Sequence, residues 1–150
     1  MALFVACANT AAAQTAVIGR IKSASGQVFL VRQKALIPVK AGQTLLVADG
    51  IRTGADGRAG ITLQDETRLS LGPNSDVQLE QFVYAPGEGR LRFALKIARG
   101  LIAYVSGRIA KLSPEAVRLE TPSAILGVRG TRLAIRVDAE RTADAPRPVP

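Results

Sequence analysis

The residue types that most often perform catalysis are nearly absent from this sequence. It contains no histidine, and its single cysteine, Cys7, lies in an apolar leader. A histidine base, a typical zinc site and, once the leader is removed, a cysteine nucleophile are therefore excluded. The chemistry left open is a serine activated by a lysine, or a pair of carboxylates.

Two short stretches could carry such chemistry, and neither fits it well. Asp65 and Glu66 are adjacent acids, but neighbours on a strand point to opposite faces and neighbours in a turn are solvated, so they make a poor acid and base pair. The glycine-rich residues 54–57 lack the strand-to-helix context and the lysine of a phosphate loop. We therefore expect a noncatalytic protein without a metal or other cofactor.

Short alternating stretches of apolar and polar residues, divided by turn signals, make up most of the chain. A composition with 14 glycines, 8 prolines and 4% aromatic residues is typical of many short strands joined by turns. Spacings of about eight residues favour an antiparallel meander or a stacked β-coil. We expect one compact all-β domain over residues 17–137, with short antiparallel strands in a stacked β-coil or sandwich-like arrangement. No segment has a capped helical stripe.

Several local features are predicted within this domain. Turns are expected at Asp49-Gly50, Asp56-Gly57 and Asp65-Glu66, and a loop at residues 85–89 is expected to divide an earlier meander from later, longer strands. Residues 90–99 alternate cleanly, which predicts a half-buried strand. Residues 101–105 are apolar on both faces, which predicts a separate strand buried from two sides.

Residues 121–137 should close the core. Thr121 precedes Pro122 and is pushed toward extended geometry. Gly127 and Gly130 stand where the backbone needs positive φ or a close approach, so Gly130→Val should cost several kcal/mol by strain. The strand that follows places Leu133, Ile135 and Val137 on one face and Arg132, Ala134 and Arg136 on the other.

The stretch Thr-Pro-Ser-Ala-Ile-Leu-Gly-Val-Arg-Gly-Thr-Arg, which begins at Thr121, resembles the closing motif of the FecR domain. This domain is the periplasmic module of iron-citrate-type signalling proteins and also occurs alone in exported bacterial proteins. Residues 49–59, 63–74 and 99–108 resemble earlier segments of the same family, in the same order. Where the family has Asp-Gly-Ser, this chain has Asp65-Glu66-Thr67, and glutamate tolerates positive φ poorly.

The resemblance implies an envelope module that interacts with another protein or senses a signal. The motif positions it implies are Asp49, Thr53, Gly54, Thr121, Pro122, Gly127, Arg129, Gly130 and Thr131. Arg129 either caps or pairs with groups inside the fold or is displayed to a partner, and the resemblance favours the structural role.

The two ends of the sequence differ from the domain between them. Residues 1–13 are uncharged and end in small residues, which predicts a signal peptide cut before Gln14 and a protein of the periplasm or cell envelope, or a secreted one. The apolar run is far short of the roughly 20 residues of a transmembrane helix, so no membrane span is expected. Residues 138–150 predict a flexible tail.

The net charge of +8 comes from 20 basic and 12 acidic residues, unevenly placed. Arg90, Arg92 and Lys96 share one strand face in a stretch without acids, which makes them a candidate binding face. Solvent-facing strands also use basic residues simply to protect edges. The alternative function is thus a basic protein that binds anionic polymer, either nucleic acid or envelope glycan. Scattered aromatic residues make nucleic acid the weaker candidate.

Overall fold

We describe the protein from a computed structural model, which covers residues 17–128 and 132–138. The predicted leader, nearly all of the predicted tail, and Arg129, Gly130 and Thr131 lie outside these residues. Strands dominate the described part, which confirms the all-β prediction. They are β1 (Val17–Ser25), β2 (Val28–Arg32), β3 (Ala35–Pro38), β4 (Thr44–Leu46), β5 (Gly50–Thr53), β6 (Arg58–Leu63), β7 (Arg68–Leu71), β8 (Asp76–Ala85), β9 (Arg90–Val105), β10 (Val117–Glu120), β11 (Ile125–Gly127) and β12 (Arg132–Val137).

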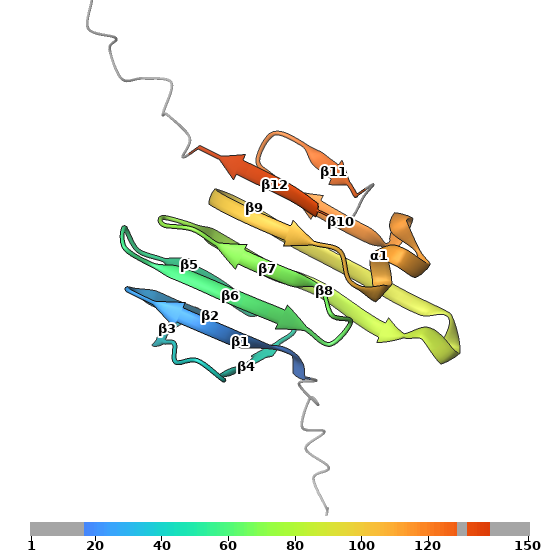
Figure 1. Ribbon diagram of the computed structural model, residues 1–150, viewed down its shortest axis with the longest axis horizontal. Helices are drawn as coiled ribbons and strands as arrows, with labels where there is room; N and C mark the ends of the chain where they lie inside the picture. Colours follow the sequence, from blue (N-terminus) through green and yellow to red (C-terminus); the bar gives the residue numbers. More distant parts are fainter. Residues whose placement is uncertain (1–16, 129–131, 139–150) are drawn as a thin grey trace, which may run out of the picture.

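These strands form one sheet that curls into two facing layers (Figure 1). Layer A consists, in order across the sheet, of β4, β1, β6, β7, the second half of β9 and β12. Layer B consists of β3, β2, β5, β8, the first half of β9, β10 and β11. With 16 residues, β9 is long enough to pair first with β8 and β10 and then with β7 and β12. It therefore joins the two layers.

Gly100 marks the point where β9 passes from layer B to layer A. Its φ of 109° is a conformation that side chains oppose, and a Cβ there would collide with Ser75. The Ser75 hydroxyl donates to the Gly72 carbonyl at 2.8 Å and accepts from the Leu101 amide at 3.2 Å. These contacts fix the bend.

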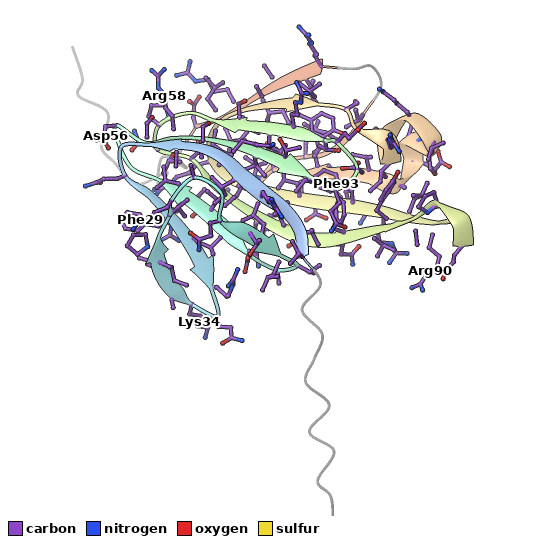
Figure 2. All side chains as sticks on the ribbon, turned by 60° about the horizontal axis from the view of Figure 1, so that its bottom comes forward. Phe29, Lys34, Asp56, Arg58, Arg90 and Phe93 are labelled. Atoms are coloured by element: carbon purple, nitrogen blue, oxygen red, sulfur yellow. The ribbon has the colours of Figure 1, made fainter. Side chains whose placement is uncertain are left out.

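The core lies between the layers and takes one face of each strand. Phe93 lies inside it (Figure 2), edge-on to Phe82 at 6.1 Å between ring centroids and stacked on Tyr104 at 6.3 Å. Alternation places the apolar side chains of each strand on one side, and each large one contributes about 1.5–3 kcal/mol when buried. Apolar residues with no exposed surface are Ile21, Leu30, Leu45, Ile51, Ile97, Ile102, Ile109 and Leu119.

The second half of β9 corrects the prediction for residues 101–105. These residues continue the strand that begins at Arg90, and they alternate: Ile102 is buried, whereas half of Leu101 is exposed and Ala103 also faces solvent. The prediction of a strand buried from two sides is wrong. Apolar residues commonly occupy exposed positions, so their presence alone cannot reveal whether a second layer covers them.

Two short helices that the sequence did not predict connect β9 to β10. α1 (Arg108–Leu112) and the 3-10 helix η2 (Pro114–Ala116) carry the chain back, so that β10 runs parallel to β9. Every other strand pairing in the described residues is antiparallel, as predicted. Five residues are too few for α1 to show an apolar stripe in the sequence.

The predicted loop at residues 85–89 is the turn of the β8–β9 hairpin and contains the 3-10 helix η1 (Pro86–Glu88). It does not divide the domain, because β8 and β9 pair along nearly the whole length of β8, from Ala85 with Arg90 to Asp76 with Arg99. None of the helices in residues 17–128 and 132–138 is long and apolar enough to cross a membrane.

Candidate functional site

Asp49 is buried just before β5 and accepts hydrogen bonds from three donors. These are Arg32 Nε at 3.0 Å, Arg32 Nη2 at 2.7 Å and the Leu46 amide at 2.8 Å. The hydrogen bond to Asp49 raises the pKa of Arg32. The turn predicted at residues 49–50 lies instead at residues 47–48. The reason is that Asp49 points its carboxylate inward, where it binds the Arg32 guanidinium and the Leu46 amide.

Thr53 and Gly54 hold the end of β5 to neighbouring segments. The Thr53 hydroxyl donates to the Gly72 carbonyl at 2.7 Å and accepts from the Ser75 amide at 2.8 Å. Gly54 donates its amide to the Gln27 carbonyl at 2.8 Å, and a Cβ on it would lie 2.7 Å from the Gln27 side-chain oxygen. Both residues are thus engaged inside the fold.

Asp65 is also buried, which corrects the prediction that it is solvated in its turn. Its carboxylate accepts from the Thr67 amide at 3.1 Å, the Thr67 hydroxyl at 2.7 Å and the Ile109 amide at 3.3 Å. The reason is tertiary, since α1 lies over the turn and directs an amide of its first turn at the carboxylate. Asp65 therefore fastens α1 to the β6–β7 hairpin.

Glu66 shows that the tight turn forms without the family's glycine. Its φ is 70°, in the left-handed region, while its side chain is exposed and approaches Arg108 Nε at 3.3 Å. Asp65 and Glu66 thus face different surroundings, one buried and one in solvent.

Tyr104 lies below the same turn, in the core. Burial raises the pKa of its hydroxyl, the nearby charge of Asp65 adds to this, and hydrogen bonds with Ser106 and Thr67 act in the opposite direction. The part of the chain that the structure describes holds no cluster of three or more Cys, His, Asp or Glu side chains that could bind a metal.

Thr121 and Pro122 form the turn between β10 and β11. The Thr121 amide donates to the Ala124 carbonyl at 2.8 Å, and the Thr121 hydroxyl accepts from the Ala124 amide at 3.1 Å. The motif therefore begins with a hairpin whose strands are β10 and β11.

Gly127 contradicts the prediction of a special backbone role. It has no positive φ, and nothing lies within 4 Å of a Cβ built on it, because it sits on the exposed edge strand β11. The roles predicted for Arg129, Gly130 and Thr131 lie outside the described residues and stay predictions. Beyond them, β12 has the predicted faces, with Ile135 buried and Ala134 exposed.

The candidate face on β9 has mixed charge. Arg90, Arg92 and Lys96 are all exposed, and Arg90 lies at the hairpin end of the molecule (Figure 2). Arg92 lines a hollow together with glutamates, whereas Lys96 lines a separate hollow that also contains an aspartate. Those acids are Glu80, Glu115 and Glu120 in the first hollow and Asp76 in the second. That the three cations form one binding face stays a prediction.

A second set of cations, which the sequence alone did not reveal, lies on the outer face of layer A. They include Arg58 on β6, Arg68 on β7 and Arg132 on β12, all exposed. Alternation predicts which face of its own strand each residue occupies. It does not tell which strands are neighbours, so the set could not be assembled from the sequence.

Comparison with known families shows to which family the chain belongs. The sequence pattern of the family described as FecR protein matches residues 49–144, which is more than half of the chain. The chain belongs to the FecR family. FecR membership confirms the resemblance drawn from the motifs and associates the chain with regulatory signalling at the cell envelope. No curated protein and no solved structure matches it significantly.

Proposed function

We propose that this FecR-family chain is a noncatalytic periplasmic module that binds another protein of the cell envelope and serves in sensing or relaying a signal. The observation that carries the proposal is that Asp49 and Asp65, two acids of the described motifs, are buried and hydrogen-bonded inside the fold. Asp49 is 2% exposed and accepts from one backbone amide, and Asp65 is 0% exposed and accepts from two. Function then rests on a surface rather than on a reactive group.

The edge strand β11 supports a protein as the partner. Among the described strands it pairs only with β10, so its other edge has no strand partner among the described residues. Ile125 at its start is 65% exposed. An edge strand with an apolar side chain is a ready template for strand addition by another chain. We infer that a partner strand adds to β11 and covers Ile125.

Site-specific photocrosslinking in intact cells tests this contact. A photoreactive residue at position 125 should capture one defined envelope protein, and the capture should persist at high salt. The matched control is position 36, since Leu36 is 53% exposed on the edge strand β3 of the same layer. Equal capture at both positions, or none at position 125, would rule out β11 as the contact.

Cell fractionation and N-terminal sequencing test the location separately. The mature protein should begin at Gln14 and be found in the periplasmic fraction. Intact Met1 on cytoplasmic protein would contradict the proposed location.

The variant Arg129→Ala separates the two roles of that residue: a lower melting temperature supports a role inside the fold. Wild-type melting with loss of the partner would place Arg129 on the binding surface.

A further inference from the structure

The outer face of layer A carries a row of small residues that crosses the strands. Strand register aligns five of them: Ser23 on β1, Gly60 on β6, Ser70 on β7, Ala103 on β9 and Ala134 on β12. These strands follow one another across Figure 1. Directly paired residues have their side chains on the same face of a sheet, so the row forms the floor of a shallow depression.

Two adjoining hollows make this depression continuous. They measure about 750 and 520 Å³, and both are lined by Gly60 and Ser70. We call the combined feature the outer groove. Hydroxyl groups line it, from Ser23 and Ser70 on the floor and from Thr62 at one side.

Basic side chains stand on both sides of the outer groove. On one side, three arginines stand in one row of strand-paired residues, which runs through Arg20, Thr62, Arg68, Val105 and Arg132. Lys22 and Lys111 line the hollow beside this row. Arg58 and Arg136 lie on the other side. Arg58 and Thr62 are four residues apart on β6, so the two rows are separated by about 13 Å.

Little negative charge balances these cations. Among the described residues, Glu66 is the one acid that lines either hollow; it lies in the larger one and pairs with Arg108 at 3.3 Å. At the other side Asp138 pairs with Arg136 at 3.2 Å, and Asp56 accepts from the Gln27 amide at 3.2 Å. The other groove cations make no ion pair with a described residue; they are Arg20, Lys22, Arg58, Arg68, Lys111 and Arg132.

The outer face of layer B is different, which makes the groove a distinct feature. There Arg92 and Arg118 share a hollow with three glutamates, and Arg52 lies 3.3 Å from Asp76. A cleft lined by charge of one sign raises the local concentration of ligands of the opposite sign. The described cations of the outer groove thus lie in a setting with fewer acids than those of the layer B hollow.

The chemistry of the groove selects among anionic ligands. No aromatic side chain lines either hollow, so there is no platform on which nucleic-acid bases could stack. A membrane surface would touch the tips of the cations and leave the floor hydroxyls unused. A linear chain that bears both acidic groups and hydroxyls can lie along the floor and meet cations on both sides.

We propose that the outer groove binds a linear anionic polysaccharide. Arginines on either side contact its acidic groups, and the serine and threonine hydroxyls of the groove bond to its sugar hydroxyls. This inference does not depend on the protein contact proposed above, since β11 belongs to layer B.

Binding of the full chain to a heparin oligosaccharide, as the probe, tests the proposal by calorimetry. The double variant Arg58→Glu, Arg68→Glu should raise Kd at least about tenfold, because two attractive contacts with sulfate or carboxylate groups become repulsive. Arg90→Glu, Arg92→Glu makes the same charge change on layer B and should alter Kd less than about twofold. Equal losses in the two variants would overturn the proposal.

A second pair of variants tests the floor without changing charge. Ser70→Trp, or Ala103→Phe if the first fails to fold, fills the groove and should weaken heparin binding several-fold while the urea midpoint stays near that of wild type. Single-stranded DNA and vesicles of anionic phospholipid serve as competitors. If either displaces heparin at equal charge concentration, or if the filled variants bind like wild type, the groove is not a polysaccharide site.

Discussion

Arg32 and Asp49 are joined by two hydrogen bonds, Nε to Oδ1 at 3.0 Å and Nη2 to Oδ2 at 2.7 Å, although 17 residues separate them in the chain. Only 3% of the Asp49 side chain is exposed, against 33% of Arg32. A desolvated carboxylate in a two-point contact of this kind has no water to replace its partners. The pair therefore ties β2 to the turn before β5.

We expect Asp49→Asn to lower the free energy of unfolding by about 2–3 kcal/mol, since the Leu46 amide and the arginine both lose a charged acceptor. Urea unfolding followed by circular dichroism measures this. The control is Asp76→Asn, whose partner Arg52 lies at 3.3 Å in a more exposed setting, and it should cost less than about 1 kcal/mol. Similar losses in both variants would show that Asp49 has no special anchoring role.

Asp65→Asn should loosen α1 selectively. The amide group of asparagine presents donors where Thr67 and Ile109 also donate, so we expect a loss of about 2–3 kcal/mol and faster hydrogen exchange at the Ile109 amide. Glu66→Gln is the neighbouring control, because the Glu66 side chain is exposed, and it should leave exchange at Ile109 unchanged. Unaltered exchange at Ile109 in Asp65→Asn would show that Asp65 does not fasten α1 to the β6–β7 hairpin.

Gly100→Ala should destabilise the protein by at least about 3 kcal/mol, through the strain of a φ of 109° and the collision with Ser75. Thermal and urea unfolding both report it. Gly87→Ala is the matched control, since Gly87 has no positive φ and a Cβ there meets nothing within 4 Å, so its change should stay within about 0.5 kcal/mol. A Gly100 variant as stable as this control would mean that the bend in β9 tolerates a side chain.

Stability should fall at alkaline pH because burial raises the pKa of Tyr104 in the folded state. In the unfolded chain tyrosine ionises near pH 10. The contribution of neutral Tyr104 is therefore complete below about pH 10 and is lost as the pH rises through the folded-state pKa. Urea midpoints between pH 8 and about 12 should show this fall. Tyr104→Phe should have a shallower slope over the same range; identical slopes would assign the loss to other groups.

Alternation and turn residues were enough to predict an all-β domain. They also predicted which face of β12, and of the first half of β9, points to the core. These properties are local, because a strand places successive side chains on opposite sides whatever its neighbours are. The motifs likewise sufficed for the FecR family. They did not separate the structural acids from solvated ones, since burial of Asp65 depends on α1, which follows it by more than 40 residues.

The sequence by itself determined the class of fold, the family and the shortage of catalytic groups. Only the tertiary structure decided which strands are neighbours, and with that the bend at Gly100, the parallel pairing of β10 with β9 and the gathering of Arg58, Arg68 and Arg132 along one groove. The physical reason is that strands pair through backbone N–H and C=O groups, which are the same in every strand and so do not specify a partner. Which strands pair is therefore settled by packing of the whole core rather than by any one stretch.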